Sequence, residues 1–214
     1  MRSQRLKNFY YNTLGRLSAF SYAWHRIYRP EHYAGAYLNL GCGPKYVEGM
    51  VNADGNLLCR KDIWLDVRLG LPFPANSLRG IYASHMIEHL DVKHVRRLFA
   101  ECYRALRPGG SVRIVVPSLD YAIRSYLEGR LENFPVWPEE YKSLGGRFNN
   151  LMLCANQHSV MFDFGMLEEL LREAGFTGIT RESPQSSRVF SQEHLQFESD
   201  PSLVNVSLYA EAVK

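Results

Sequence analysis

The stretch Tyr37–Asn56 reads YLNLGCGPKYVEGMVNADGN and holds two short apolar runs, at 37–40 and 50–54, on either side of a glycine loop. Both runs have the length and residue types of buried strands. Gly41 and Gly43 can adopt backbone angles that strain other residues, and without side chains they let a ligand come close to the main chain. The stretch therefore predicts a strand, a ligand-binding loop and a second strand.

The loop lacks the features of the common phosphate sites. It has no GxGxxG fingerprint and no Lys followed by Ser or Thr, as a P-loop would have. Only Pro44 to Gly49 separates it from the second strand, so at most a turn or two of helix fits there. A diphosphate would gain from the dipole of a full helix N-terminus. We therefore expect a ligand without phosphates.

The chain beyond the loop alternates between strands and helices. Buried strands are predicted at 62–67, 80–84 and 111–116, each bounded by Gly, Pro, Asn or Asp. Between the last two lies DVKHVRRLFAECYRALRPGG, an amphipathic helix with Asp91 as its N-cap and a stop at Pro108 and Gly109. Strand, helix and strand in this order imply a parallel sheet covered by helices, hence a doubly wound α/β fold.

The second half is less regular. Helices are predicted at 119–129 and 163–174, the latter capped by Asp163 and ended by Gly175, and strands at 178–182 and 203–210. Residues 131–150 are rich in Pro, Gly, Asn and aromatics and read as an insertion or lid, and 183–202 as a polar surface loop. We expect an N-terminal amphipathic helical cap at 1–34 and one domain at 35–214, with the lid or insertion at about 119–160.

Composition excludes several classes of protein. The 214 residues, 46% hydrophobic and 22% charged, suit one globular domain. A net charge of +3 is too mild to indicate nucleic acid. The four cysteines form no CxxC pair, which argues against a zinc site or a disulfide framework. No apolar run reaches a membrane span, and no signal peptide is visible, so we expect a cytoplasmic protein.

The first thirty residues carry six basic side chains, no acidic one and seven aromatic ones. Apolar residues recur at helical spacing, which predicts an amphipathic helix with a break near Gly15. One interpretation is a cap whose aromatic face packs on the domain or covers its ligand cleft. A second is peripheral contact of residues 1–30 with an anionic membrane surface, at the inner face of the membrane. Contact with nucleic acid is a third.

Two acids follow the strands around the loop. Asp54 closes the second strand, where a carboxylate can accept two hydrogen bonds from ribose hydroxyls. Asp66 closes the third strand before LGLPFPANS, and its carboxylate could accept from an adenine amino group. The fourth strand ends in YASHMIEHL, and RALRPGGSVRIVVPS supplies a helix end and a fifth strand.

Taken together, LNLGCGP, the Asp54 position, D…LPFP…S, SHxxEHL and RALRPGGSVRIVVPS resemble the class I S-adenosylmethionine-dependent methyltransferases, in particular the small type-11 group. The resemblance is close over residues 36–118 and looser through HSVMFDFGMLEELLREAGF. It implies a Rossmann-like seven-stranded sheet, with S-adenosyl-L-methionine as cofactor and S-adenosyl-L-homocysteine as product. It also implies the following cofactor-binding residues: Asn39, Leu40, Gly41, Cys42, Gly43, Pro44, Asp54, Gly55, Asp66, Val67, Ser84 and His85.

Methyl transfer asks little of side chains, because the sulfonium already makes the methyl group electrophilic. A base is needed only where the acceptor must lose a proton. His158 and His85 are the candidates, each with a structural hydrogen bond as the alternative role. Cys42 has a sufficient explanation as a small side chain between two glycines.

A metal site is not our first expectation, but one alternative exists. His85, Glu88 and His89 have the i, i+3, i+4 spacing of one helical face, and His158 could add a fourth ligand. The pattern EVIEH with a distant His resembles small-RNA 2′-O-methyltransferases and some quinone-pathway enzymes, where a divalent metal orients the acceptor hydroxyl. Here His85 replaces the first Glu, which removes a carboxylate suited to magnesium.

The acceptor is the least determined part. The insertion carries aromatic and basic groups that would suit a sugar ring, an acidic glycan or a phosphorylated intermediate, and a solvated charged face would look the same in sequence; these are Tyr121, Arg124, Tyr126, Arg130, Phe134, Trp137, Tyr141, Lys142, Arg147 and Phe148. The resemblance favours O-methylation of a sugar, a glycan-linked acceptor or a small molecule. The alternatives are a non-catalytic cofactor-binding subunit that acts through the N-terminal helix, and a metal-assisted RNA methyltransferase.

Overall fold

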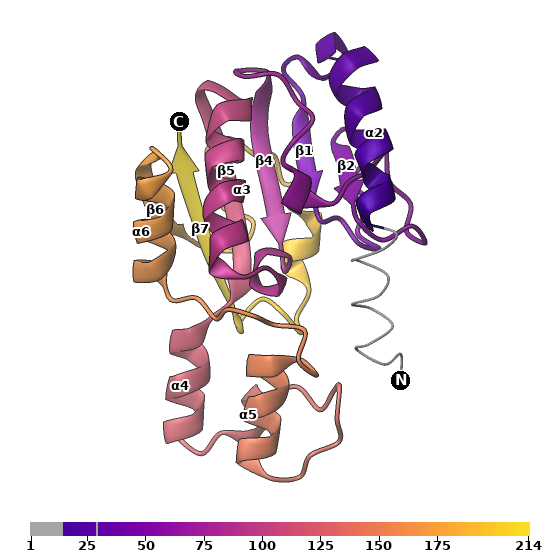
Figure 1. The fold of residues 1–214 in the computed structure, drawn as a ribbon. Coiled ribbons are helices and arrows are strands. Elements are labelled where there is room, and N and C mark those ends of the chain that lie inside the picture. Colours follow the sequence, from indigo (N-terminus) through magenta and orange to yellow (C-terminus); the bar gives the residue numbers. More distant parts are fainter. Residues whose placement is uncertain (1–14, 29) are drawn as a thin grey trace.

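The computed structural model describes residues 15–28 and 30–214. Its centre is a seven-stranded sheet of order β3-β2-β1-β4-β5-β7-β6 (Figure 1). The first five strands pair in parallel, while β7 runs antiparallel to both β5 and β6. The strands are β1 (Tyr37–Leu40), β2 (Val51–Asp54), β3 (Ile63–Trp64), β4 (Leu78–Ser84), β5 (Leu106–Pro117), β6 (Thr177–Glu182) and β7 (Ser207–Val213). The doubly wound, seven-stranded fold predicted from the sequence is confirmed.

The strand order reverses between β1 and β4, which pair with each other in parallel. From β1 the chain adds β2 and β3 toward one edge of the sheet, and from β4 it continues to β5 toward the other edge. Their residues are almost completely buried, as parallel strands covered on both faces must be. Several strand boundaries differ from the prediction, among them the start of β5, which lies at Leu106 instead of residue 111. β3 has only two residues because the chain turns at Asp66 into a short 3-10 helix, and β7 begins at Ser207 rather than at residue 203.

The helices begin where the sequence places capping residues. Asp91 accepts a hydrogen bond from the His94 N–H at the start of α3, and Asp163 accepts one from the Met166 N–H at the start of α6. The α-helices are α2 (Gly15–Tyr28), α3 (Val92–Ala105), α4 (Leu119–Leu127), α5 (Leu144–Leu153) and α6 (Phe164–Glu173). The 3-10 helices are η2 (Pro30–Tyr33), η3 (Val67–Leu69), η4 (Ile87–His89), η5 (Leu131–Asn133) and η6 (Gln196–Ser199). α3 ends at Ala105, three residues before Pro108, because β5 starts directly after it.

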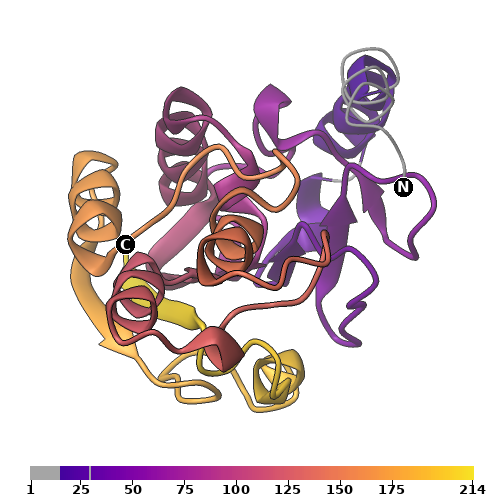
Figure 2. The same ribbon diagram turned by 90° about the horizontal axis from the view of Figure 1, so that it is seen from below.

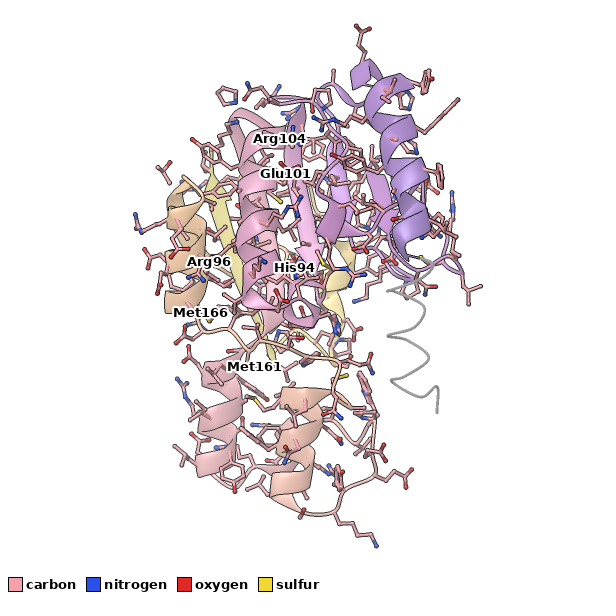
Figure 3. The ribbon with its side chains drawn as sticks, in the orientation of Figure 1. His94, Arg96, Glu101, Arg104, Met161 and Met166 are labelled. Atoms are coloured by element: carbon pink, nitrogen blue, oxygen red, sulfur yellow. The ribbon has the colours of Figure 1, made fainter. Side chains whose placement is uncertain are left out.

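Helices α2, α3 and α6 cover one face of the sheet (Figure 2). On α3, Glu101 and Arg104 form an ion pair of 2.8 Å, and both hold the segment that enters the sheet before β4 (Figure 3). Glu101 accepts from the Leu71 N–H, and Arg104 donates to the Phe73 carbonyl. The predicted helix face thus packs on the main core and also anchors the LGLPFP segment.

The other face of the sheet is covered by residues 183–200 instead of a long helix (Figure 2). Phe190 and Leu195 are buried there against Tyr82, Val115 and Tyr209. The segment predicted as a polar surface loop is mostly exposed loop, but its Phe190 and Leu195 side chains fill a second core.

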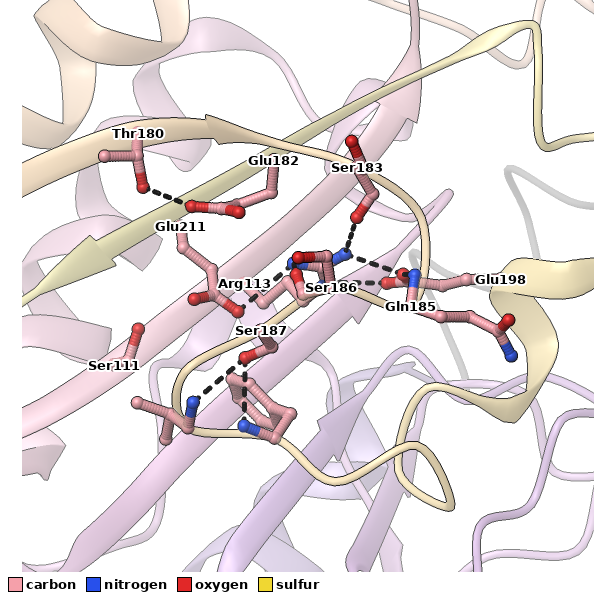
Figure 4. Close-up of polar contacts among 12 residues, drawn as sticks. Ser111, Arg113, Thr180, Glu182, Ser183, Gln185, Ser186, Ser187, Glu198 and Glu211 are labelled. Carbon is pink, nitrogen blue, oxygen red and sulfur yellow. Dashed lines mark hydrogen bonds and ion pairs between the residues drawn. The ribbon is translucent and has the colours of Figure 1, made fainter.

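A buried ion pair holds this segment to the sheet (Figure 4). Arg113 on β5 is completely buried and donates two hydrogen bonds of 2.7 Å to Glu198. Glu211 on β7 lies 3.2 Å from the same guanidinium, which also donates to the Ser183 and Ser186 carbonyls. Because every donor direction is used, the charge is tolerated without water.

Residues 119–153 form a helical insertion beyond the carboxyl ends of the parallel strands (Figure 1). α4 and α5 pack on each other around Ala122, Phe134 and Leu151. Since this cluster is separate from the main core, the insertion has its own small interior and stands beside the end of the sheet where ligands bind.

Within the described residues, helix α2 spans Gly15–Tyr28 and contacts β3. Its inner side meets the domain through Ser18, whose hydroxyl accepts a hydrogen bond of 3.2 Å from the Asp66 N–H, and through Tyr22, which packs on the main core. Its outer side turns five large apolar side chains to solvent: Leu17, Phe20, Trp24, Ile27 and Tyr28. The part of the predicted N-terminal helix at residues 1–14 lies outside the described residues. Within the described ranges, no helix is long and apolar enough to cross a membrane.

Candidate functional site

A cleft of about 650 Å³ opens at the carboxyl ends of β1, β2 and β4, beside the point where the strand order reverses. This volume lies in the range of small-molecule sites. Its lining residues are Gly41, Gly43, Asp54, Gly55, Asn56, Leu65, Asp66, Val67, Arg68, His85, Met86, His89, Leu90, Asp91, His94, Gln157 and Ser159. They come from the β1, β2 and β4 ends, from the start of α3 and from the segment before α6.

The glycine loop is held in one conformation by its neighbours. Gly41 has φ +71°, and a Cβ at this position would lie 2.2 Å from Cγ of Met86, so no other residue fits there. The Gly41 N–H donates to the Ala53 carbonyl, which joins the loop to β2. A Cβ on Gly43, by contrast, would meet nothing within 4 Å, because Gly43 faces the open cleft.

Asp54 joins this loop to the turn after β2. One carboxylate oxygen accepts from the Gly43 N–H at 2.8 Å, and the other accepts from the Asn56 N–H at 2.6 Å. Each carboxylate oxygen has two lone pairs, so both keep an accepting position after these bonds. Asp54 therefore has the capacity predicted for it, to accept from two ribose hydroxyls.

Asp66 is more heavily occupied than the sequence suggested. Both of its oxygens accept hydrogen bonds from the Arg68 side chain, between 2.7 and 3.0 Å, and one also accepts from the Arg68 N–H. An adenine amino group would have to compete with this bidentate pair. Arg68 lines the cleft as well, and the sequence did not mark it.

The cleft brings together some of the predicted cofactor residues and not others. Gly41, Gly43, Asp54, Gly55, Asp66, Val67 and His85 line the cleft, whereas Asn39, Leu40, Cys42, Pro44 and Ser84 do not. Asn39 is buried and donates to Asn52 and to the Lys45 carbonyl, so it shapes the loop from below. Leu40 is completely buried in the main core. Contacts from these positions to a ligand would have to come from the main chain.

Cys42 points into the interior, where its thiol lies 3.8 Å from the Arg60 carbonyl. Burial, with a smaller contribution from the charge of Asp54, raises the pKa of the Cys42 thiol to about 12. A thiol in this state is a poor nucleophile at neutral pH. This agrees with the interpretation of Cys42 as a small side chain between two glycines.

His85 stands at the carboxyl end of β4 in a strained conformation, with φ +51°. Left-handed backbone at a residue other than glycine is costly and concentrates at functional sites. The His85 N–H donates to the Val115 carbonyl, Nε2 lies 2.9 Å from the Ser207 hydroxyl and Nδ1 lies 3.4 Å from a Glu88 oxygen. The main chain of His85 is thus held by Val115 and its ring by the Ser207 hydroxyl, with the Glu88 carboxylate nearby.

His158 does not line the cleft, although Gln157 and Ser159 on either side of it do. Its Nδ1 donates to the Leu151 carbonyl at 3.1 Å, and burial lowers the pKa of the His158 imidazole. The ring therefore lies within the wall and is favoured in its neutral form. This position does not favour the direct contact with an acceptor that a catalytic base needs.

The four-residue metal site also needs correction. His85, Glu88 and His89 do not share a helical face, because His85 precedes the 3-10 helix η4 and has left-handed backbone. Glu88, His89 and His158 do come together, with one ligand atom of each within 4.8 Å of the others.

Sequence reasoning missed several lining residues, among them Asn56, Met86, His94, Gln157 and Ser159. Asn56 and His94 each stand two or three residues from a predicted acid, Asp54 or Asp91, which could have pointed to them. Gln157 and Ser159 flank the predicted His158, but nothing in the sequence shows that they face the cleft.

The aromatic and basic residues of the insertion, predicted to cover the acceptor, do not line the cleft. Phe134 and Phe148 lie in the small core of the insertion, their ring centroids 5.8 Å apart. Trp137 and Tyr141 are exposed. The insertion borders the site with its helices, and these side chains serve its interior or its outer surface.

Comparison with known proteins places the fold. The family model described as a methyltransferase domain, of type 11, matches residues 49–114. A structure titled as a SAM-dependent methyltransferase from Archaeoglobus fulgidus has a TM-score of 0.51 at 16% identity and covers 92% of this chain and 94% of that one. One from Thermotoga maritima has a TM-score of 0.53 at 13% identity, with 92% and 97% covered. A search of the curated proteins found no match.

A third similar structure is a complex between a Haloferax volcanii methyltransferase and the activator Trm112, with a TM-score of 0.52 at 14% identity and 91% and 89% of the chains covered. Residues 49–114 thus match the model of the type-11 methyltransferase domain, and the chain as a whole shares the class I methyltransferase fold with these structures.

Proposed function

We propose that this chain is an S-adenosylmethionine-dependent methyltransferase that methylates an oxygen of a small-molecule or glycan-linked acceptor. The observation that carries the proposal is the carboxylate of Asp54, which joins the glycine loop to β2 and lines a cleft at the carboxyl ends of the strands. A carboxylate at this place suits the ribose of a nucleoside. The product would be S-adenosylhomocysteine.

The residues present fit this cofactor. Gly41 and Gly43 leave the loop open to a close ligand, and the cleft volume of about 650 Å³ is sufficient for a nucleoside with an amino-acid tail. Asp54 would hold the ribose, and Leu65 and Val67 would contact the base. When bound, the cofactor supplies an electrophilic methyl group, so the protein has mainly to align the acceptor and exclude water.

His85 is the residue that we propose as the base. It lines the cleft, and Glu88 lies close enough to its Nδ1 to orient the ring and stabilise the imidazolium. An acceptor hydroxyl would pass its proton to His85 as its oxygen forms the bond to the methyl carbon. A general base of this kind contributes about 10²–10⁴-fold to the rate.

The charge of the cleft supports a neutral acceptor rich in hydroxyl groups. Among the residues that line the cleft, Arg68 is the one with a Lys or Arg side chain, and it forms an ion pair with Asp66. Polar groups that suit hydroxyls stand nearby on His94, Gln157 and Ser159. A nucleic acid would need positive groups for its phosphates, so RNA is disfavoured as acceptor.

The proposal is tested by incubating the protein with cofactor carrying a labelled methyl group and with cell extract, then separating glycan, small-molecule and RNA fractions. We expect label in the glycan or small-molecule fraction and a loss of about 10²-fold or more with His85→Gln. The control is His194→Gln, a histidine on the opposite face of the sheet. Transfer to no fraction despite cofactor binding would favour the non-catalytic subunit instead, and label in RNA would favour an RNA methyltransferase.

We further propose that the chain works in the cytoplasm in peripheral contact with the inner face of the membrane. Phe20, Trp24 and Ile27 on α2 are 77%, 53% and 64% exposed, although aromatic and aliphatic groups of this size gain free energy when buried. The surrounding segment carries six basic residues and no acid among its first thirty residues. An apolar helix face within a basic segment suits the boundary of an anionic bilayer.

A further inference from the structure

Glu88 is a buried carboxylate without a hydrogen-bond partner. Its side chain is completely buried. Within residues 15–28 and 30–214, three buried side-chain polar atoms have no hydrogen-bond partner: both carboxylate oxygens of Glu88 and the Tyr82 hydroxyl. His85 approaches to 3.4 Å without hydrogen-bond geometry. Since a buried charge costs several kcal/mol unless it is paired or ligates a metal, this group requires an explanation.

Two histidines stand beside this carboxylate with their ring orientations fixed. His89 Nδ1 lies 3.0 Å from the Gln157 carbonyl, and His158 Nδ1 lies 3.1 Å from the Leu151 carbonyl. A carbonyl can only accept, so in both rings Nδ1 carries the proton and the neutral ring keeps its lone pair on Nε2. Metal-ligating histidines characteristically donate their other ring nitrogen to a carbonyl or carboxylate in this way.

The main chain holds the two segments together. The Ser159 N–H donates to the Glu88 carbonyl at 2.7 Å, and the Val160 N–H donates to the same carbonyl at 3.3 Å. The rings of His89 and His158 then meet edge to face, with centroids 5.0 Å apart. Main-chain hydrogen bonds thus hold residues about seventy positions apart in the sequence beside each other.

We infer that Glu88, His89 and His158 bind a divalent cation of the zinc type. One ligand atom of each residue lies within 4.8 Å of the others. Two imidazoles and one carboxylate are the donors of three-ligand zinc sites that keep an open coordination position. Magnesium and calcium prefer several oxygen ligands, of which this group offers one residue.

A second group of metal-ligating residues in the described part of the chain shows the contrast. Cys42, Asp54 and Cys59 also lie close together. There, however, each oxygen of Asp54 already accepts a hydrogen bond, from the Gly43 or the Asn56 N–H, whereas the oxygens of Glu88 accept none. The free carboxylate and the fixed lone pairs distinguish the Glu88 group.

The position of the site suggests its role, and this step depends on the proposed function. His89 lines the cleft together with His85, so the open coordination position would face the acceptor. A cation there would polarise an acceptor hydroxyl and lower its pKa, and the released proton would pass to His85. The cation would also neutralise the buried charge of Glu88.

The test begins with chelator-treated protein, titrated with Zn²⁺ by calorimetry and with Co²⁺ by visible absorption. We expect one site per chain, and a loss of affinity of at least about tenfold in both His89→Gln and His158→Gln. His194→Gln and Cys59→Ser are the controls and should bind as the wild type does. Zn²⁺ should raise the unfolding temperature of the wild type and of the controls more than that of the two variants.

Absence of Zn²⁺ binding, or binding unchanged in both His89→Gln and His158→Gln, would overturn the metal site. The same preparations are titrated with S-adenosylhomocysteine, which separates the two proposals. Product binding without Zn²⁺ binding removes the metal site alone, whereas Zn²⁺ binding without product binding retains the site and contradicts the proposed function.

Discussion

The carboxylate of Asp54, at the end of β2, accepts a hydrogen bond of 2.8 Å from the main-chain N–H of Gly43, in the loop after β1. The bond links the two strand ends that border the cleft and fixes the loop against which a ligand would lie. It also explains why a loop without a following helix can be a well-defined site. The carboxylate takes over the anchoring that a helix N-terminus provides elsewhere.

Replacement of Asp54 by Ala should weaken binding of S-adenosylhomocysteine by at least about tenfold. The change removes two charge-assisted main-chain bonds and the acceptors for the ribose, each worth about 1.5–3 kcal/mol. Calorimetry measures the affinity. Asp120→Ala, an exposed carboxylate outside the cleft, should leave it unchanged, and equal affinities of the two variants would show that Asp54 does not contact the cofactor.

Gly41→Ala should destabilise the protein by about 2–5 kcal/mol, the sum of a left-handed backbone angle and an overpacked site. The added Cβ would lie 2.2 Å from Met86 Cγ. Gly129 has a similar φ of +69° with open space around it, so Gly129→Ala isolates the cost of the angle, about 1–2 kcal/mol. Urea unfolding compares them. Similar losses in the two variants would refute the contact with Met86.

Glu101 should make stability depend on pH in the acid range. The hydrogen bond from Arg104, together with one from the Leu71 N–H, lowers the pKa of the Glu101 carboxyl below its ordinary value of 4.5. A carboxyl with a lowered pKa in the folded state stabilises it above the unfolded pKa, and this stabilisation is lost as pH falls through the folded pKa. Wild-type protein should therefore lose stability more steeply below about pH 4.5 than Glu101→Gln does.

Urea unfolding between pH 3 and pH 7 measures this difference. Glu140→Gln, on the exposed surface of the insertion, serves as control and should follow the wild-type profile. If Glu101→Gln showed the same steepness as the wild type, the ion pair on α3 would not account for acid sensitivity.

Membrane contact through α2 predicts that the double variant Phe20→Ser, Trp24→Ser floats less with anionic vesicles than the wild type. Both side chains lie on the exposed side of the helix, so their loss removes buried apolar area from the bound state without opening the core. Val136→Ser with Trp137→Ser, exposed on the insertion, is the matched control. Equal flotation of both double variants would exclude α2 as the contact.

The sequence predicted the local parts of the structure well, because local chemistry determines them. Asp91 and Asp163 cap their helices as expected, and the strand on either side of the glycine loop is where the apolar runs lie. The place of Asp54 in the cleft wall follows from its position at the carboxyl end of β2. The parallel, doubly wound sheet was predicted from the alternation of strands and helices, and its Rossmann-like seven-stranded form from the resemblance to the class I methyltransferases.

The errors concern contacts between distant residues. The segment 183–200 is held to the sheet by the ion pair between Arg113 and Glu198, which are 85 residues apart. Its polar composition does not indicate this contact. The ion pair between Arg68 and Asp66 was not predicted, while the contact of Asp66 with adenine stays a prediction. Gln157 and Ser159 reach the cleft because the Ser159 N–H donates a hydrogen bond to the Glu88 carbonyl. No local sequence pattern predicts this contact.

The most direct test of the central claim is a calorimetric titration of the wild-type protein with S-adenosylmethionine and with S-adenosylhomocysteine. If the cleft around Asp54 is the cofactor site, both ligands bind once per chain and compete with each other. Absence of binding to both ligands by folded protein would contradict the account.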